Sequence, residues 1–224
     1  GVYDRRPLIS VVMAVYNGEE YLTAAIESIL QQNYQNLEII IINDASTDET
    51  SSILKRYLSL DNRIKLIDNE TNIGLGVSLQ QGINIAQGEY IARMDADDIS
   101  LPNRFEKQIG YLLDHPDVLV LGGKASLIGQ ESEDYDLELP MDQELIRWNM
   151  LLGNGLILIH GSVMFRREFF DRFGTYNDFR AAQDFELWSR TFAIEPLPIA
   201  NLGSVIYLSR DNKNSTTRSR SDLQ

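Results

Sequence analysis

Three carboxylates lie within four residues at Asp95, Asp97 and Asp98, directly after the apolar run 90–94. Like charges this close repel one another, which destabilises the fold unless something positive binds among them. Carboxylate oxygens in an Asp-x-Asp spacing suit a hard divalent cation such as Mg²⁺ or Mn²⁺. If the extended geometry persists, Asp95 and Asp97 point the same way, so both are candidate metal ligands. A solvated acidic turn that caps the following helix is the alternative interpretation.

The acidic run follows the last of four expected strands in the first half of the chain. These strands are apolar and rich in β-branched residues, as expected of strands buried on both faces; they cover residues 8–15, 37–42, 64–67 and 90–94. Segments with apolar residues at helical spacing separate them. The alternation predicts an α/β fold with a mostly parallel sheet, flanked by helices that form right-handed crossovers. Ligands of such sheets bind beyond the carboxyl ends of the strands, which is where the acidic run lies.

The helices of this half carry recognisable end signals. Ser46 and Glu49 have the spacing of a capping box, which predicts the start of the second helix. A loop at residues 72–76 leads into the third helix, and Gly88 is expected to end it. Pro102 is expected in or near the first turn of the fourth helix.

After residue 117 the pattern changes to shorter and less regular elements. Strands are expected at residues 118–121, 125–128, 160–165 and 198–208, and helices at 143–152, up to 173, and from 182 onward. An acidic, irregular connection covers residues 130–142, and the composition of residues 213–224 predicts a flexible tail. We expect a single domain, residues 1–224, made of two halves at about 8–117 and 118–210.

Composition excludes several classes of function. The chain has 224 residues, a formal net charge of −13 and no cysteine. No basic surface is available to neutralise the phosphates of a nucleic acid. Disulfides, thiolate metal sites and cysteine nucleophiles are excluded. Neither a run of about 18 apolar residues nor a signal segment is found, so we expect a cytoplasmic protein without a transmembrane segment.

Further polar side chains are expected at the edge of the sheet where the acidic run lies. Asp44 follows the second strand, where it either faces the same crevice as Asp95 or caps the next helix. Tyr16 and Asn17 end the first strand, and Tyr16 either stacks on a base or packs at the strand end. Arg93 is a counter-charge for the acidic run or a phosphate, or only a charge at a strand end.

Weaker candidates lie outside these strand ends. Gly74 and Gly76 resemble a phosphate-cradling turn, but a lone Gly-x-Gly is a weak signal and here follows the third strand. Asp184 and Glu186 are two apart on an expected helix, so they cannot share a face, and one is expected in a cleft. A helix cap is the alternative role for Asp184. His160 is more often a core or strand-end histidine than a ligand.

Six motifs occur in a fixed order along the chain. They read VVMAVYNGEEYL, IIIINDASTDET, NIGLGVSLQQGI, GEYIARMDADDISLPNRF, HGSVMFRR and QDFELW. In sequence and order they resemble the inverting family-2 glycosyltransferases of the GT-A type, over residues 8–207. The resemblance implies a Rossmann-like GT-A fold with a nucleotide-binding first half and an acceptor-binding second half. It also implies transfer of one sugar from a nucleotide-sugar donor to a hydroxyl acceptor.

The resemblance implies roles for individual residues of the donor site. Asp44 looks like the family's base-contacting aspartate, which favours a UDP-sugar, with Tyr16 and Asn17 beside the nucleotide. Asp95 looks like the ribose-side carboxylate, and Asp97 like the direct ligand of Mn²⁺ or Mg²⁺ at the donor's two phosphates. The remaining expected nucleotide-binding residues are Asn72, Gly74, Arg93 and Ala96.

On the acceptor side, Asp184 matches the family's proposed general base. The acceptor is expected to be a saccharide or lipid-linked saccharide of bacterial surface polysaccharide or glycolipid synthesis, which leaves peripheral membrane association at the inner face open. Gln183 stands where many relatives carry a second acid, so the base assignment depends on Asp184 alone. Gly161 stands where many relatives carry Pro or Cys, so the resemblance leaves the acceptor-side role of residues 160–162 open.

Four other functions were weighed. A sugar-nucleotide-forming nucleotidyltransferase needs a basic, Gly-rich loop after the first strand, whereas Glu19 and Glu20 make this loop acidic. Gln183 keeps open a catalytically silent sugar-nucleotide-binding module. An aspartyl phosphatase would carry its Asp-x-Asp after the first strand. A processive synthase is rejected because its Gln-x-x-Arg-Trp motif is missing after Asp184.

Overall fold

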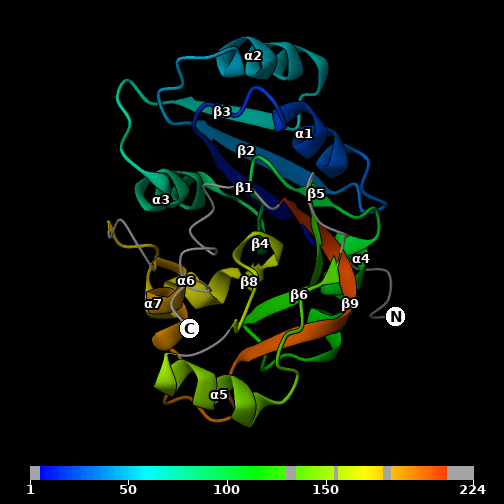
Figure 1. Cartoon of the computed structure of the whole chain (residues 1–224), viewed down its shortest axis with the longest axis vertical. Helices are drawn as coiled ribbons and strands as arrows, with labels where there is room; N and C mark the ends of the chain where they lie inside the picture. Colours follow the sequence, from blue (N-terminus) through cyan, green and yellow to red (C-terminus); the bar gives the residue numbers. More distant parts are fainter. Residues whose placement is uncertain (1–5, 130–134, 154–155, 179–182, 211–224) are drawn as a thin grey trace.

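The computed structural model describes residues 6–129, 135–153, 156–178 and 183–210 (Figure 1). A nine-stranded sheet runs through the described part of the chain in the order β3-β2-β1-β4-β8-β6-β9-β5, and β7 pairs with β6. Strands from both halves of the sequence therefore belong to one sheet, with β4 and β8 adjacent at its middle.

The first half alternates strands and helices as the sequence predicts. Its elements are β1 (Ile9–Val15), α1 (Leu22–Leu30), β2 (Leu37–Asn43), α2 (Thr50–Leu60), β3 (Ile64–Asp68), α3 (Leu75–Ile85) and β4 (Tyr90–Arg93). All four strands run parallel. The expected α/β fold with a mostly parallel sheet is confirmed.

The elements after β4, which end the first half and make up the second, are shorter and have mixed strand directions. They are β5 (Ile99–Ser100), α4 (Arg104–Asp114), β6 (Val120–Ile128), β7 (Tyr135–Asp136), α5 (Gln143–Leu152), the 3₁₀ turn η2 (His160–Ser162), β8 (Met164–Arg166), α6 (Arg167–Phe173), α7 (Gln183–Ser189) and β9 (Ile199–Arg210). Strand β8 runs antiparallel to β4 and to β6. Strands β6 and β9 are parallel, with register shifts around Lys124.

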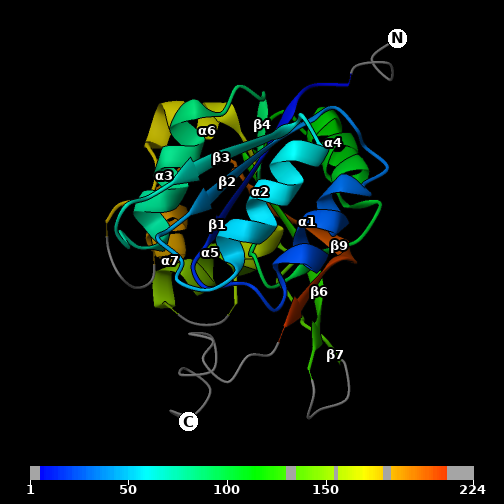
Figure 2. The same cartoon turned by 90° about the horizontal axis from the view of Figure 1, so that it is seen from above.

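Two hydrophobic cores cover the two faces of the sheet. Successive side chains of a strand point to opposite faces, so Val11 and Met13 join one core and Val12 the other. Helices α1, α2 and α4 lie over the first face, and α3, α6 and α7 over the second (Figure 2). Burial on both faces explains why the first strands are continuously apolar.

Several predicted boundaries in the second half are wrong. The strands expected at 118–121 and 125–128 are one strand, β6, because its register shifts carry the chain through Gly122 and Gly123 without a turn. The strand expected at 160–165 is shorter, since residues 160–162 form η2 and only β8 is extended. The two-residue strands β5 and β7 were not predicted.

Two helix-end predictions in the first half are also wrong. Helix α2 begins at Thr50 without a side-chain cap, and Ser46 Oγ instead accepts the Asn17 amide (3.0 Å). Helix α3 ends at Ile85 rather than at Gly88, whose amide donates to Ser10 Oγ (2.7 Å). A contact with the loop after β1 in the first case, and with strand β1 itself in the second, replaces the predicted cap.

Some expectations lie outside the described residues. These are the flexible tail at 213–224, residues 130–134 of the acidic connection, and the start of the helix expected at 182. Within the described ranges, the structure holds no helix with the length and apolar character needed to span a bilayer.

Candidate functional site

The carboxyl ends of β1, β2 and β4 meet at one edge of the sheet. In register, Val15 pairs with Asn43, and Val12 pairs with Arg93. The residues that directly follow these strands are therefore brought together, as their order in the sequence predicts. They are Tyr16 and Asn17 after β1, Asp44 after β2, and the acidic run after β4.

Asp44 is buried and holds the loop that leads into α3. Its Oδ1 accepts hydrogen bonds from Asn69 Nδ2 and the Ile73 amide, both at 2.9 Å. Its Oδ2 accepts the Gly74 amide at 2.9 Å. Helix α2, which directly follows Asp44, receives no cap from it. A carboxylate has about four acceptor positions, so these contacts leave one for a ligand N–H.

The predicted glycine loop supports Asp44. Asn72 Nδ2 donates to the Asp44 carbonyl (3.3 Å). Gly74 has φ +92° and precedes the first residue of α3. Few other residues adopt this φ, so Gly74 allows two successive amides to converge on one carboxylate.

The loops after β1 and β2 hold each other at the rim. Asn17 Oδ1 accepts the Thr47 amide (2.8 Å), while the Asn17 amide donates to Ser46 Oγ (3.0 Å). Asn17 and Ala45 both have positive φ, a conformation that disfavours alanine. Tyr16 is 54% exposed, so its ring is available for stacking on a ligand.

Asp95 forms a short ion pair with the neighbouring Arg93. Arg93 Nη2 lies 2.6 Å from Asp95 Oδ1, and the guanidinium is buried. Burial works to raise the pKa of the Asp95 carboxyl, but Arg93 and then His160 outweigh it and hold that pKa below its ordinary value. Arg93 is thus a counter-charge for the acidic run, one of the roles the sequence allows.

The other two carboxylates of the run differ in environment. Asp98 is buried and its Oδ1 accepts the Arg210 amide (2.8 Å). Burial, followed by the charges of Asp95 and Asp97, raises the pKa of Asp98 to about 8. Asp97 and Ala96 are half-buried at the tip of the loop. Among the described residues, no group of three or more histidine or acidic side chains surrounds a possible metal position.

The second half of the chain contributes a turn that contacts the acidic run. The Asp95 amide donates to the Tyr207 hydroxyl (3.1 Å). A Cβ on Gly161, in η2, would overlap that hydroxyl and lie 2.6 Å from Asp95 Oδ2. Glycine is therefore required at position 161 by close approach, which accounts for the departure from Pro or Cys.

His160 lies between the acidic run and the start of α7. Its Nε2 is 2.5 Å from the Tyr176 hydroxyl. Burial and then Arg93 lower the pKa of His160 to about 4, while Asp95 and Asp184 act in the opposite direction. The imidazole is therefore neutral at pH 7 and within electrostatic range of carboxylates from both halves.

Asp184 and Glu186 point to different partners, as their spacing predicts. Glu186 pairs with Arg190 (2.6 Å) and accepts from Asn177 (3.1 Å). Asp184 is half-buried in the first turn of α7. Its negative charge acts to raise the pKa of His160 and of Tyr176.

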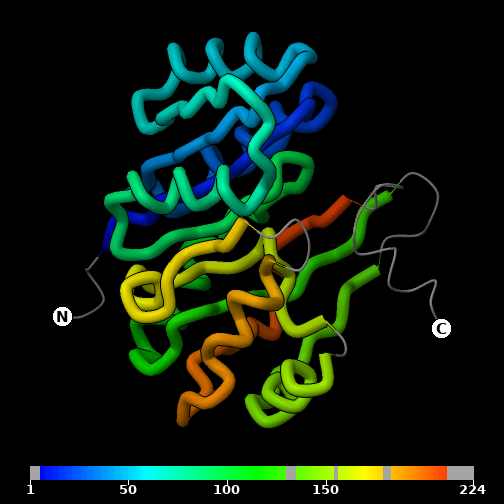
Figure 3. The backbone as a smooth tube through the Cα atoms, turned by 90° about the vertical axis from the view of Figure 1, so that its left-hand side faces the viewer, coloured from blue at the N-terminus to red at the C-terminus, as the bar shows by residue number. Residues whose placement is uncertain are grey.

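Helix α3 brings the start of α7 to the donor side of the site. Gln80 Nε2 donates to Thr175 Oγ1 (3.0 Å). A Cβ on Gly76 would lie 2.7 Å from the Asn177 carbonyl oxygen and 3.3 Å from Gln183 Cδ. Figure 3 shows α3 resting on the yellow-to-orange segment that precedes α7. The start of α3 therefore contacts Asp44 through the Gly74 amide, and it approaches Gln183, the residue before Asp184, at Gly76.

The sequence interpretation missed three side chains of this site. Tyr207 and Asn69 received no role, and His160 was assigned to the core or a strand end. Of the three residues, only His160 could have been singled out from the sequence, because it directly precedes the unusual Gly161 in the HGSVMFRR motif. Tyr207 and Asn69 contact the site through long-range packing, which local spacing does not reveal.

Comparison with known proteins identifies relatives over most of the chain. The family model described as glycosyl transferase family 2 matches residues 10–174. The putative glycosyltransferase EpsE of Bacillus subtilis is 36% identical over 95% of this chain and 76% of its own length. The amylovoran biosynthesis glycosyltransferase AmsE of Erwinia amylovora is 30% identical over 95% of this chain and 80% of its own length.

Solved structures share the fold at low identity. S. aureus TarS 1-349 in complex with UDP-GlcNAc superposes with a TM-score of 0.72 at 20% identity, covering 94% of this chain and 60% of TarS. The mannosyltransferase PcManGT of Pyrobaculum calidifontis, in complex with GDP-Man and Mn²⁺, gives a TM-score of 0.74 at 18% identity, covering 96% and 60%. The chain thus spans about 60% of the length of these structures. Fold, motif order and the relatives agree, and the chain belongs to glycosyl transferase family 2.

Proposed function

We propose that this chain transfers one sugar, with inversion, from a nucleotide-sugar donor to a hydroxyl acceptor, and that donor binding depends on a divalent cation. The observation that carries the proposal is the placement of two carboxylate positions at one sheet edge, with a third, Asp184, near enough to act on the pKa of His160 as Asp95 does. Asp44 follows β2, the acidic run follows β4, and Asp184 opens α7 against α3.

Asp44 and Tyr16 are the residues proposed to bind the base. The remaining acceptor position of the Asp44 carboxylate suits a base N–H, and a pyrimidine such as uracil offers one beside its carbonyls. Tyr16 stacks on the same base from the exposed rim. Relatives in structures bind different nucleotides, UDP-GlcNAc in TarS and GDP-Man in PcManGT. A UDP-sugar is the donor that we favour.

Asp95 and Asp97 are proposed to hold Mn²⁺ or Mg²⁺ together with the donor diphosphate. Mg²⁺ commonly binds through one or two carboxylates plus substrate phosphates rather than in an all-protein cage. The acidic run fits that pattern, because burial and then the charges of Asp95 and Asp97 raise the pKa of Asp98, while Asp95 and Asp97 themselves lie nearer the surface. The cation supplies positive charge for the diphosphate as it departs.

Asp184 is proposed to act as the general base. The acceptor hydroxyl oxygen forms a bond to the anomeric carbon while the bond from that carbon to the diphosphate oxygen breaks. The hydroxyl proton passes to the Asp184 carboxylate, and the electron pair leaves with the nucleoside diphosphate. His160, uncharged at pH 7 and bonded to Tyr176, is placed to position the acceptor rather than to take this proton.

The names of the relatives support a proposal for the acceptor class. One of them is named for amylovoran biosynthesis. We propose a saccharide or lipid-linked saccharide acceptor in surface polysaccharide or glycolipid synthesis.

The test compares Asp184→Asn with the matched control Glu186→Gln on the same helix. Release of UDP from UDP-sugars is measured with a panel of saccharide acceptors and Mn²⁺. Removing a general base costs about 10²- to 10⁴-fold in rate, so Asp184→Asn should fall by this factor with UDP affinity retained. Glu186→Gln loses its part-buried ion pair to Arg190 and should lower stability. Its rate should stay within about threefold of wild type, because Glu186 has no role in the proposed proton transfer.

Full activity of Asp184→Asn would place the base elsewhere. Nucleotide binding without donor turnover in wild type would indicate a silent binding module. Release of pyrophosphate from UTP and a sugar phosphate would indicate a nucleotidyltransferase.

A further inference from the structure

Arg104, the first residue of α4, carries a buried charge with an unusual set of partners. The residue is 0% exposed. None of the carboxylates in the described part of the chain forms an ion pair with it. Burying a cation without a paired anion costs several kcal/mol. The hydrogen bonds of the buried guanidinium must therefore offset this cost.

Those hydrogen bonds go to the end of β4 and to the turn that faces it. Arg104 Nη2 donates to the Arg93 carbonyl (2.7 Å) and to the Val163 carbonyl (3.3 Å). Arg104 Nη1 donates to Ser100 Oγ (2.9 Å). One planar guanidinium therefore connects residues that lie on both sides of the acidic run.

Gln108, one helical turn further along α4, extends this network. Arg104 Nε donates to Gln108 Oε1 (3.1 Å). Gln108 Nε2 donates in turn to the Ser162 carbonyl (2.8 Å) and the Leu121 carbonyl (3.1 Å). Both side chains are fully buried. The network thus fixes Ser162, which directly follows Gly161 in η2.

The two ends of this network enclose the contact between Asp95 and Gly161. On one side Arg104 holds the carbonyl of Arg93, two residues before Asp95. On the other side the Arg104–Gln108 network holds the residues directly after Gly161. Because a Cβ at position 161 would already lie 2.6 Å from Asp95 Oδ2, small shifts of either segment would displace this carboxylate.

We propose that Arg104 is a positioning residue for the diphosphate end of the donor site, which sets the carboxylate loop 95–98 against η2 through the carbonyls of Arg93 and Val163. The proposal rests on the proposed function of that loop. The guanidinium remains charged at neutral pH, although burial lowers its pKa to about 10. Lysine is a poor replacement, because a single ammonium cannot reproduce the planar fork.

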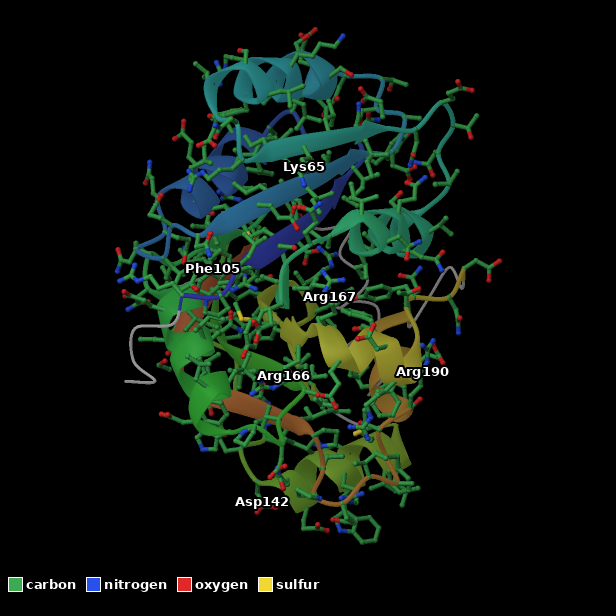
Figure 4. The ribbon with its side chains drawn as sticks, turned by 180° about the vertical axis from the view of Figure 1, so that it is seen from behind. Lys65, Phe105, Asp142, Arg166, Arg167 and Arg190 are labelled. Carbon is green, nitrogen blue, oxygen red and sulfur yellow. The ribbon has the colours of Figure 1, made fainter. Side chains whose placement is uncertain are left out.

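Arg166, the last residue of β8, provides a matched control because it contacts the opposite end of strand β4. Its guanidinium is also a carbonyl clamp, with Nε donating to the Val118 carbonyl (2.8 Å) and Nη2 to the Leu112 carbonyl. Its Nη1 donates to the hydroxyl of Tyr90, the first residue of β4 (2.8 Å). Figure 4 labels Arg166 and also Phe105, the neighbour of Arg104. Arg166 holds the start of β4, whereas Arg104 holds its end.

The experiment measures the dissociation constants of UDP, dTDP, GDP and CDP by calorimetry, with and without Mn²⁺, for wild type, Arg104→Lys and Arg166→Lys. The readout is the metal gain, the ratio of the two constants for one nucleotide. Changing residues that orient metal ligands typically costs about 10- to 100-fold in metal affinity. We expect the metal gain of Arg104→Lys to fall by this factor, with its metal-free affinity near that of wild type. Arg166→Lys should unfold at a lower temperature but keep the full gain.

Each outcome decides the proposal. An unchanged metal gain in folded Arg104→Lys, or an equal loss in Arg166→Lys, overturns it and leaves the proposed function standing. A wild type without any metal gain overturns both. If Arg104→Lys does not fold, Ser100→Ala removes one partner of the guanidinium, and a loss of metal gain supports the proposal while an unchanged gain overturns it.

Discussion

Replacing Asp44 by Asn changes one atom in the most densely bonded side chain of the site. Asp44 Oδ1 accepts two donors and Oδ2 accepts the Gly74 amide. In either orientation the new amide group turns a donor toward a donor, so at least one of these bonds is lost. A hydrogen bond to a charged group contributes about 1.5–3 kcal/mol, and an unsatisfied buried N–H costs about 1–3 kcal/mol. We therefore expect a loss of about 2–5 kcal/mol in the free energy of unfolding.

The loss is measured by thermal and urea denaturation. For a chain of this size 1 kcal/mol corresponds to about 2–4 °C in Tm, so Asp44→Asn should unfold roughly 4–20 °C below wild type. The proposed bond to the base is also removed, which should weaken UDP binding about tenfold or more. Asp142→Asn is the control. Asp142 caps α5 at the far end of the molecule (Figure 4), and asparagine caps equally well.

Two results would refute this reasoning. If Asp44→Asn unfolds at the wild-type temperature, the three bonds to its carboxylate contribute nothing to the loop before α3. If the variant loses stability but binds UDP as wild type does, Asp44 is only a structural anchor and the base lies elsewhere.

Two further predictions concern the acidic loop and the opposite end of the sheet. Gly161→Ala forces a Cβ against Tyr207 and Asp95. We expect a loss of about 1–3 kcal/mol in the free energy of unfolding and a smaller metal gain in UDP binding. Unchanged UDP binding would show that Asp95 tolerates the shift. Glu38 pairs with Lys65 (2.7 Å); burial works to raise its pKa, but the bonds from Lys65 and Ser10 hold it below the ordinary 4.5. A lowered native pKa gives stability that is fully present above pH 4.5 and lost as the pH falls through the native pKa. The difference in free energy of unfolding between wild type and Glu38→Gln should therefore shrink from pH 7 to about pH 3.5, and a constant difference in urea titrations would contradict the assignment.

Strands β1, β2 and β4 were predictable because burial on both faces leaves a direct trace in the sequence, whereas in the edge strand β3 only Ile64 is buried. Runs such as 37–42 consist almost entirely of β-branched and other apolar residues, and no other local structure suits them as well. The position of the acidic run then followed from the alternation of strands and helices, since all parallel strands end at the same edge.

The second half was less predictable because its elements depend on distant partners. Residues 160–162 directly precede the apolar residues 163–165 and were expected to extend that strand, but Gly161 lies close to Tyr207 and Asp95, and residues 160–162 form a 3₁₀ turn. Strand β6 continues through Gly122 and Gly123, residues that normally end a strand, because Ile206 and Asn201 of β9 pack closely against them. Sequence spacing contains neither contact.

The site residues show the same division. Asp44, Asp95 and Asp184 were predicted from motifs, because carboxylates at the ends of strands and helices are a local signal. The bonds that hold Asp44 and the residues of the acidic run come from Asn69, Tyr207 and, through the Arg93 carbonyl, Arg104; these residues received no role from the sequence, and their bonds are visible only in the folded chain.

The most direct test of a metal-dependent donor site is thermal unfolding of wild type with UDP, dTDP, GDP or CDP, each with and without Mn²⁺. A ligand at a hundredfold excess over its Kd raises stability by about 2.7 kcal/mol, or roughly 5–11 °C for a chain of this size. We expect this shift for UDP or dTDP in the presence of Mn²⁺, and its loss in Asp97→Asn. A folded protein whose Tm does not change with any nucleotide, with or without the metal, would contradict the donor site at the edge of this sheet.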